Sequence, residues 1–184
     1  MIHWHHPALY VAKSTIGPLA KGCFTKKSIK KNELIWYVED FPKVTLSQLK
    51  ILGAHNPDMM YAQPVGKDEY LAIVPELKSS PIETLNHSCD PNIVYLGSSV
   101  LLAWKDIPAG GELFYDYGTA ENIGYEPNHM DIINPCLCGS KDCRGKVNTR
   151  DAKKLVHKYG IYMQKFVLRE LNFSNDQVNE YFYD

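Results

Sequence analysis

The stretch Asn86-His87-Ser88-Cys89-Asp90-Pro91-Asn92 decides how the rest of this chain is interpreted. It is dense in hydrogen-bonding side chains and interrupted by proline, so it is typical of a tight polar turn and not of a strand interior. Two later stretches belong with it. Gly111-Glu112-Leu113-Phe114-Tyr115-Asp116-Tyr117-Gly118 places two tyrosines on one face of an extended segment, and Cys136-Leu137-Cys138-Gly139-Ser140-Lys141-Asp142-Cys143-Arg144-Gly145 is a C-x-C-x4-C run. Each is a weak signal alone, but the three in this order are specific.

Composition places the chain among ordinary globular proteins. It has 184 residues, of which 45% are hydrophobic and 22% charged, which suits one domain with a proper core. The sequence has no apolar run of the roughly 20 residues that a membrane span needs. The N-terminus lacks the pattern of a signal peptide, so we expect an intracellular protein: nuclear or chromosomal in a eukaryote, cytoplasmic or an exported effector in a bacterium. A net charge of -1 argues against nucleic-acid binding through bulk basicity.

Three of the five cysteines fall within eight positions, which suits a metal clip better than a disulfide framework. Structural zinc takes four ligands, so this loop needs one more, and Cys23 and Cys89 are the remaining thiols. The segment Ile2 to Pro7 holds three histidines. For it we favour a polar surface arm over a second metal site.

The pattern of apolar residues predicts many short strands and few helices. β-branched and aromatic runs indicate strands over 9–12, from Cys23, and over 33–38, 61–62, 70–74, 99–104 and 112–115. One helix is predicted over 46–52, with Thr45 as its cap and Gly53 at its end. The tail changes to helices, which we expect to begin at Thr149 or Asp151 and close at Gly160, to run over 162–171, and to start again after Ser174.

These residues resemble the SET-domain protein-lysine methyltransferases. The Asn86–Asn92 stretch looks like the family's N-H-S-C-x-P-N motif, 112–117 like its E-L-x-[FY]-D-Y motif, and 136–145 like its zinc-binding post-SET tail. The segments 14–35 and 103–112 are similar to the family's opening segment and to its run into the catalytic strand. The resemblance covers Ala8 to Gly145, about three quarters of the chain.

The chain departs from the family's pattern in four places. The opening Gly-x-Gly reads Ala20-Lys21-Gly22, the family's Y-x-G-E reads Tyr37-Val38-Glu39-Asp40, and Glu83 stands where a basic residue is frequent. Too little chain precedes Ala8 for the cysteine-rich pre-SET domain of some members. These differences leave the chemistry intact and bear on the substrate.

The resemblance implies a mainly β fold of several small sheets, in which the C-terminal motif threads under a loop as a pseudoknot, an exception to the rule against knots. It divides the chain into a SET domain over 1–132, a post-SET zinc-binding segment over 133–147 and a helical C-terminal extension over 148–184.

The resemblance also implies methyl transfer from S-adenosylmethionine to a lysine side chain. Tyr117 would be the catalytic tyrosine and Tyr37 a tyrosine lining the lysine channel. Tyr115 stands at a position that carries Phe or Tyr in the family, and a tyrosine there narrows the channel end, which predicts mono- and dimethylation. For Tyr117 and Tyr37 the alternative is a packed aromatic side chain without a catalytic role.

The cofactor and zinc ligands are likewise implied by the resemblance. Asn86 and His87 would hold the cofactor through side-chain and backbone hydrogen bonds, the alternative being a polar turn that satisfies its own hydrogen bonds. Tyr61 would be a further contact, the alternative being simple core packing. The backbone of Lys21, Gly22 and Cys23 would meet its amino-acid end. Zinc would be held by Cys89, Cys136, Cys138 and Cys143, which leaves Cys23 as a small buried thiol.

The substrate is predicted less sharply than the reaction. Acidic residues are frequent around the motifs and suit a basic, lysine-bearing protein such as a histone tail; they are Asp106, Glu112, Asp116, Glu121, Glu126 and Asp131. For the basic helix from Asp151 to Tyr159 we favour a solvated face over contact with an acidic partner or nucleic acid. Two other classes compete: a SET-fold module that binds a protein without turnover, and a zinc-knuckle nucleic-acid binder, which the acidic surroundings disfavour.

Overall fold

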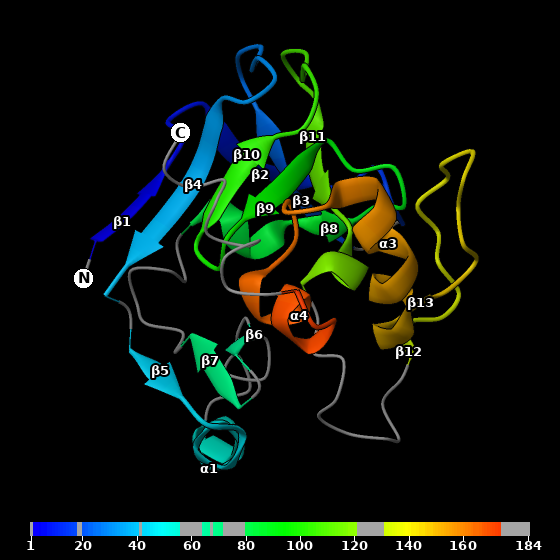
Figure 1. Ribbon diagram of the computed structural model, residues 1–184. Helices are drawn as coiled ribbons and strands as arrows, with labels where there is room; N and C mark the ends of the chain where they lie inside the picture. The colour runs from blue at the N-terminus through cyan, green and yellow to red at the C-terminus, as the bar shows by residue number, and fades with distance from the viewer. Residues whose placement is uncertain are drawn as a thin grey trace.

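The computed structural model describes residues 2–17, 20–40, 42–55, 64–66, 68–71, 80–120 and 131–173. Two four-stranded sheets form its centre (Figure 1). The first is antiparallel throughout, in the order β1 (Ile2–His5), β4 (Leu34–Glu39), β10 (Val100–Ala103) and β9 (Ile93–Leu96). The second has the order β2 (Leu9–Lys13), β3 (Lys21–Thr25), β11 (Glu112–Tyr115) and β8 (Asn86–His87), and its last pair is parallel.

The main core contains side chains from both sheets. Its fully buried members include Ile35, Ile93, Leu101 and Leu113, which come from four different strands. β-branched and aromatic side chains pack well on a pleated surface, which is why these segments form strands. The mainly β fold and the strands predicted over 9–12, 33–38, 99–104 and 112–115 are confirmed, with ends that differ by one or two residues.

Two sequence-based predictions about this region were wrong. Residues Ile2–His5, predicted as a polar surface arm, form an edge strand, because they pair with β4 along their full length and Trp4 stacks on Tyr37. Asn86 and His87 are not in a turn but form β8, and the turn begins at Ser88. The side-chain pattern could not reveal that β11 provides a partner strand.

A third sheet lies at the far end of the molecule beside helix α1 (Leu46–His55), in the order β5 (Lys43–Val44), β7 (Glu69–Leu71) and β6 (Pro64–Gly66) (Figure 1). Thr45 caps α1 as predicted, since its Oγ1 accepts the Gln48 N–H at 3.2 Å and its N–H donates to Gln48 Oε1 at 2.8 Å. The helix does not end at Gly53, however, but continues to His55. The strand predicted over 61–62, and the later part of that over 70–74, lie outside the described residues.

The C-terminal part begins with the strand pair β12 (Asp131–Ile133) and β13 (Val147–Asn148), which encloses the cysteine loop. After the turn η4 (Thr149–Asp151) come α3 (Ala152–Tyr159) and α4 (Lys165–Glu170). Gly160 closes α3 with φ of 54°, as predicted. The second helix starts three residues later than expected because the N–H of the buried Gln164 bonds the Thr119 carbonyl. The helix predicted after Ser174 lies outside the described residues.

The two C-terminal helices pack against the first sheet. Tyr159, Met163 and Phe166 form a second core with Val94 of β9, and Trp104 covers its edge. The basic side chains of α3 are exposed, and whether they meet only solvent stays a prediction; they are Lys153, Lys154, His157 and Lys158. Within the described residues, no helix has the length and apolarity to cross a membrane.

Candidate active site

The site is built where β8 and β11 run parallel. Phe114 lies opposite Asn86 and Tyr115 opposite His87. Asn92 fastens the turn to the same strand, because its side chain accepts the Phe114 N–H at 2.8 Å and donates to the Glu112 carbonyl at 2.7 Å. The Asn92 amide thus forms the same kind of donor and acceptor pair with the backbone of β11 that a neighbouring strand would form. This pairing brings the first two motifs of the sequence together.

Tyr117 stands at the end of β11, in the short turn η3 (Tyr117–Thr119) that Asp116 caps. Its hydroxyl donates to the carbonyl of Leu85, just before β8, at 2.9 Å. Its ring lies 4.7 Å from that of Tyr115 and 5.4 Å from that of His87, and it is half-buried. The side chain is therefore held between the two motifs.

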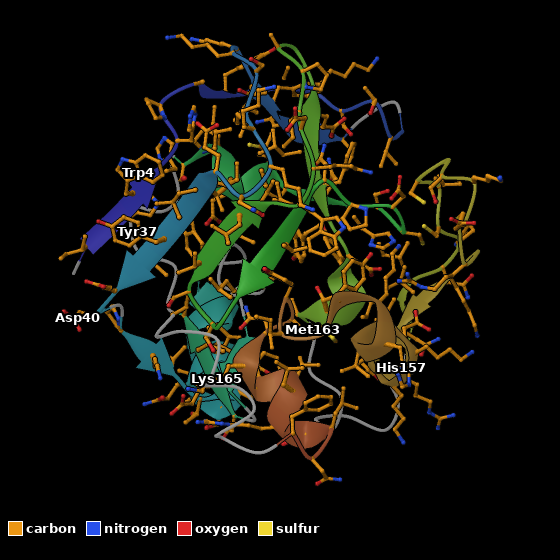
Figure 2. All side chains as sticks on the ribbon, turned by 45° about the horizontal axis from the view of Figure 1, so that its top comes forward. Trp4, Tyr37, Asp40, His157, Met163 and Lys165 are labelled. Atoms are coloured by element: carbon orange, nitrogen blue, oxygen red, sulfur yellow. The ribbon has the colours of Figure 1, made fainter. Side chains whose placement is uncertain are left out.

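The two other predicted channel tyrosines lie in different surroundings. Tyr115 packs edge-on against Tyr95 at 5.5 Å and beside Tyr117, so the structure brings it to the site. Tyr37 lies on β4 and stacks on Trp4, with ring centroids 6.2 Å apart (Figure 2). Within the described residues, the ring contact of Tyr37 is with this edge strand and not with Tyr115 or Tyr117. Its role in the channel stays a prediction.

Three of the predicted cofactor residues lie around the carboxylate of Glu112: Lys21, Gly22 and Asn86. Asn86 Nδ2 lies 2.8 Å from the Lys21 carbonyl oxygen and 3.1 Å from Glu112 Oε1. A Cβ on Gly22 would overlap Oε1 of Glu112 and lie 2.7 Å from its Cδ. Only glycine fits where the backbone approaches a carboxylate this closely. That contact explains why the second glycine of the opening motif is present although the first is Ala20.

Cys23 behaves as the leftover thiol that the sequence predicted. It is fully buried, and burial, followed by the nearby charge of Glu112, raises the pKa of its thiol to about 12. Only its backbone can therefore reach a ligand. The predicted contact Tyr61 lies outside the described residues.

The cysteines of the third motif meet the first motif as predicted. One ligand atom each from His87, Cys89, Cys136 and Cys138 lies within 4.8 Å of the others. Cys143 lies outside this group of four but adjoins it, because it packs against the same cluster and its Sγ lies 3.7 Å from the Cys136 carbonyl oxygen. In a tetrahedral zinc site with bonds of about 2.3 Å, sulfur atoms lie about 4 Å apart, so the spacing suits such an ion.

The chemistry of the thiols also fits a cation. Burial raises the pKa of Cys89 to about 11 and that of Cys136 to about 12, so their thiolates lack sufficient compensation from the protein alone. For Cys138, burial is outweighed by hydrogen bonds from the Cys89 and Ser140 backbones and from nearby side chains, which lower its pKa to about 6. A metal ion bound here would stabilise the thiolate forms.

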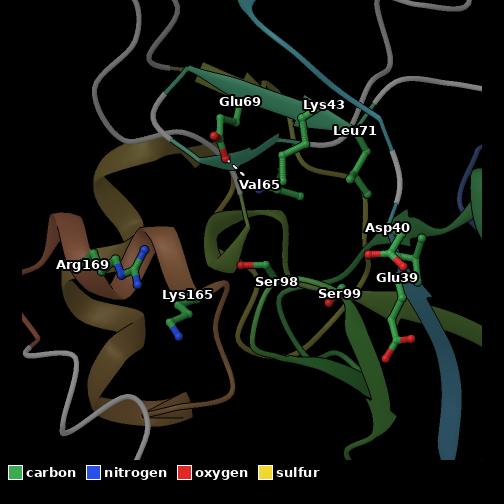
Figure 3. Close-up of a pocket in the computed structure, with 11 residues that line it drawn as sticks. Glu39, Asp40, Lys43, Val65, Glu69, Leu71, Ser98, Ser99, Lys165 and Arg169 are labelled. Carbon is green, nitrogen blue, oxygen red and sulfur yellow. Dashed lines mark hydrogen bonds and ion pairs between the residues drawn. The ribbon is translucent and has the colours of Figure 1, made fainter. Parts of the chain in front are cut away.

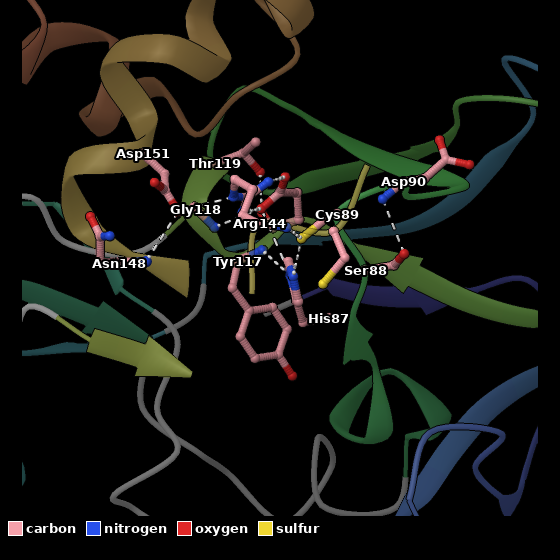
Figure 4. Close-up of polar contacts among 12 residues, drawn as sticks. His87, Ser88, Cys89, Asp90, Tyr117, Gly118, Thr119, Arg144, Asn148 and Asp151 are labelled. Atoms are coloured by element: carbon pink, nitrogen blue, oxygen red, sulfur yellow. Dashed lines mark hydrogen bonds and ion pairs between the residues drawn. The ribbon is translucent and has the colours of Figure 1, made fainter. Parts of the chain in front are cut away.

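His87 faces this cluster, which sequence reasoning did not anticipate. Its Nδ1 accepts the Tyr117 N–H at 3.2 Å, and its Nε2 lies 3.3 Å from Cys89 Sγ (Figure 4). Burial lowers the pKa of His87 to about 4, reinforced by Arg144 and opposed by Asp116. The neutral ring thus carries its proton on Nε2 and donates it to Cys89. Its side chain thus joins Cys89 to the backbone of Tyr117.

Arg144 is the functional candidate that sequence reasoning missed. Its guanidinium donates two bonds of 2.7 Å to Asp116, which is fully buried, and one of 3.0 Å to Asp151 (Figure 4). Its backbone N–H points to Cys89 Sγ at 3.4 Å. The signal was present in the sequence, because a carboxylate beside a buried strand needs a cation and the cysteine loop contains an arginine.

Of the acidic residues around the motifs, the three whose side chains the structure describes are bonded within the chain, which does not support the basic-peptide surface that the sequence suggested. Glu112 and Asp116 are buried and bonded within the chain, while Asp106 pairs with Lys30 at 2.9 Å on the surface. Glu121 and Glu126 lie outside the described residues, as does the side chain of Asp131. Glu112 and Asp116 therefore serve hydrogen bonds within the chain and do not offer their charge to a basic substrate.

A separate pocket of about 790 Å³ opens between the third sheet, the β9–β10 turn and α4 (Figure 3). Lys165 and Arg169 of α4 lie on one side, Glu39 and Asp40 on the other, and Lys43 pairs with Glu69 at 3.0 Å. The lining includes both signs of charge and no residue of the three motifs.

Comparison with known proteins agrees with this geometry. The SET domain family profile matches residues 20–118, more than half of the chain. "Histone-lysine N-methyltransferase, H3 lysine-9 specific dim-5" of Neurospora crassa is 32% identical over 105 residues, 49% of this chain and 31% of that protein. "Histone-lysine N-methyltransferase NSD3" of Mus musculus is 32% identical over 139 residues, 70% of this chain and 9% of that protein.

The enzyme "Histone-lysine N-methyltransferase, H3 lysine-4 specific" of Schizosaccharomyces pombe is 30% identical over 141 residues, 69% of this chain and 14% of that protein. The chain thus spans less than a third of the length of these relatives. The family profile covers β3 to Tyr117 and therefore includes both strands that build the site. The chain belongs to the SET-domain family.

Proposed function

We propose that the chain is a protein-lysine methyltransferase that uses S-adenosylmethionine. The observation that carries the proposal is Tyr117, a half-buried phenol whose proton is committed to the Leu85 carbonyl beside the β8–β11 pair. A phenol held in this way acts toward a second partner as a hydrogen-bond acceptor without adding charge. It is suited to orient an amine.

The substrate must reach the site as a neutral amine. A lysine side chain has a pKa of about 10.4, so at neutral pH most of it is the protonated ammonium, which cannot attack the methyl group. The aromatic rings of Tyr115 and Tyr117 offer a partly dehydrated channel end, which favours loss of the proton to solvent. The tyrosine oxygen then aligns the nitrogen lone pair, and such positioning supplies much of the rate.

S-adenosylmethionine supplies a methyl group whose bond to sulfur breaks, with the electron pair left on sulfur, as the lysine nitrogen bonds the carbon. Asn86 and the backbone of Lys21, Gly22, Cys23 and His87 would hold it, and Tyr61 would be a further contact. Zinc would be held by Cys89, Cys136, Cys138 and Cys143. It would fix the cysteine loop beside the β8 turn, with His87 as a hydrogen-bond donor to Cys89.

We propose a histone, or another basic protein, as substrate, because the relatives are named for histone H3 lysines. That substrate implies a nuclear or chromosomal location in a eukaryotic cell. Mono- and dimethylation are proposed from the hydroxyl of Tyr115 at the channel end. A non-catalytic SET-fold binding module is the competing function.

The test is transfer of labelled methyl from S-adenosylmethionine to a panel of lysine-rich proteins that includes core histones. We expect label to enter a protein with the wild-type chain and with Tyr162→Phe, a matched tyrosine that packs on Trp104 in the second core. Tyr117→Phe should lose most of the transfer. Absence of transfer with binding of S-adenosylhomocysteine intact would favour the binding module, and absence of both would contradict the proposal.

A further inference from the structure

Glu112 is a buried carboxylate with an unusually complete set of donors. Its side chain accepts hydrogen bonds from Ser14 Oγ at 2.7 Å, from Thr15 N at 2.7 Å, from Thr15 Oγ1 at 2.6 Å and from Asn86 Nδ2 at 3.1 Å. It is only 6% exposed. Burial raises its pKa, but the bonds from Thr15, Ser14 and Asn86 outweigh that effect and lower it. Glu112 is therefore charged at neutral pH.

This carboxylate fixes which way the Asn86 amide points. Asn86 Nδ2 faces Glu112 Oε1 and the Lys21 carbonyl oxygen, neither of which can donate a hydrogen bond. The reverse orientation of the amide would place three oxygen atoms together. The Nδ2 group must consequently face inward, and Oδ1 must face away from Glu112.

The amide oxygen is thereby left for a ligand. Within the part of the chain that the structure describes, Asn86 engages protein atoms through Nδ2, and the side chain is half-exposed. Oδ1 is an acceptor beside the Lys21 carbonyl, and a negative carboxylate lies behind both. Such an arrangement suits an ammonium group. The two oxygens accept its hydrogen bonds, and the negative charge of Glu112 behind them stabilises its positive charge.

We propose that Glu112 is a positioning residue for the amino-acid end of S-adenosylmethionine, acting through the orientation of Asn86. The inference rests on the proposed function and deepens it. Glu112 does not touch the cofactor, because Gly22 and Asn86 lie between; it decides which atom of Asn86 the cofactor meets. Its carboxylate also holds Ser14 and Thr15 in place through hydrogen bonds.

The variant Glu112→Gln tests this orientation directly, because it keeps the shape but provides one acceptor oxygen. The N–H of Thr15 cannot turn, so the new carbonyl would face Thr15 and the new NH₂ group would face Asn86. Two NH₂ groups would then oppose each other, and Asn86 would turn its Oδ1 inward. A ligand ammonium would meet NH₂ in place of an oxygen.

The measurement is calorimetric binding of two probes, S-adenosylhomocysteine and 5′-methylthioadenosine, which lacks the amino-acid end. We expect Glu112→Gln to weaken S-adenosylhomocysteine about tenfold or more, as loss of a charge-assisted bond does, and to change methylthioadenosine less than about twofold. The charge-removing control Asp106→Asn, on the surface, should change neither. Ser14→Ala, a milder change, should weaken the binding of S-adenosylhomocysteine about threefold and leave that of methylthioadenosine unchanged.

The two probes separate positioning from a merely structural role. Equal loss of both ligands in Glu112→Gln and Ser14→Ala would overturn the inference in favour of general damage to the fold. Unchanged S-adenosylhomocysteine binding in both variants would overturn it as well, while the proposed function stood. A wild-type chain that binds neither probe would overturn the proposed function, and this inference with it. Should Glu112→Gln fail to fold, as thermal unfolding would show, Ser14→Ala decides.

Discussion

Arg144 donates one 2.7 Å hydrogen bond from Nη1 to Oδ2 of Asp116 and a second from Nη2 to Oδ1. Asp116 lies between Tyr115 and Tyr117 in the sequence. The cysteine loop is thereby fixed to the strand that carries the candidate catalytic residue. Through Asp151 the same guanidinium reaches the start of the C-terminal helices. One side chain connects three parts of the chain that the sequence presents as separate segments.

Removal of this guanidinium is predicted to be severe. Arg144→Ala leaves the fully buried Asp116 without its cation, which typically costs about 3–5 kcal/mol. We expect a large loss of stability in urea unfolding and loss of methyl transfer. Arg144→Lys keeps the charge but not the bidentate geometry, so its stability and its methyl transfer should lie between those of the wild type and Arg144→Ala. A chain with Arg144→Ala as stable as wild type would contradict this role for the pair.

Zinc content is the next prediction. The wild-type chain purified without chelators should contain about one zinc ion, as expected for a closed four-ligand site, when metal is measured by mass spectrometry. Cys89→Ala should lose most of it, because it removes one of four ligands and leaves a site that water must complete. Cys23→Ala is the matched control, since this thiol is equally buried but lies outside the cluster.

Full zinc retention in Cys89→Ala, or near-zero zinc in the wild type, would show that the cluster is not the predicted site. His87→Ala asks a related question. If His87 is a hydrogen-bond donor to the Cys89 thiolate and not a ligand, zinc should remain bound with lower affinity.

Much of the fold could be predicted because its signals are local. Runs such as Leu34–Glu39 and Glu112–Tyr115 carry β-branched or aromatic residues, while Thr45 begins α1 and Gly160 ends α3 by local chemistry. The wrong predictions concern Ile2–His5 and Asn86–His87, whose structure depends on a partner strand distant in sequence. No local pattern contains that information.

The site shows the same division. The motifs placed Asn86, Tyr117 and the cysteines together, whereas the pairing of Arg144 with Asp116 joins side chains 28 positions apart. The role of Glu112 was misread for a related reason. A carboxylate near a motif resembles a substrate-facing charge until its donors are known, and those donors lie 97 and 98 positions away in sequence.

Gly22 provides a prediction about the opening motif. A Cβ in Gly22→Ala would overlap the Glu112 carboxylate, which four hydrogen bonds hold in place. We expect Glu112 or β3 to shift and the affinity for S-adenosylhomocysteine to fall. Ala20→Gly, which restores the family's first glycine, should leave the affinity nearly unchanged. Equal affinities of the two variants in calorimetry would contradict this explanation of Gly22.

Tyr115 is predicted to limit the degree of methylation. Its ring lies between Tyr95 and Tyr117, so its hydroxyl takes up space at the channel end. Tyr115→Phe removes that oxygen, and we expect a shift of the product toward trimethyl-lysine in mass spectrometry at matched turnover. Mostly trimethyl-lysine from the wild-type chain would contradict the predicted mono- and dimethylation.

The rate should rise with pH, because the reaction consumes the neutral amine. With a lysine pKa near ~10.4, the neutral fraction grows about tenfold for each pH unit between 7 and 9. A channel that lowers this pKa reduces the slope at the upper end, so the curvature reports how strongly Tyr115 and Tyr117 dehydrate the amine. Initial rates of methyl transfer at saturating S-adenosylmethionine and constant ionic strength measure it. A flat profile from pH 7 to 9 would mean that the amine is already neutral in the complex, or that a step other than its deprotonation limits the rate. Measuring kcat and kcat/KM separately would distinguish these, since kcat/KM follows the free substrate and kcat the bound one.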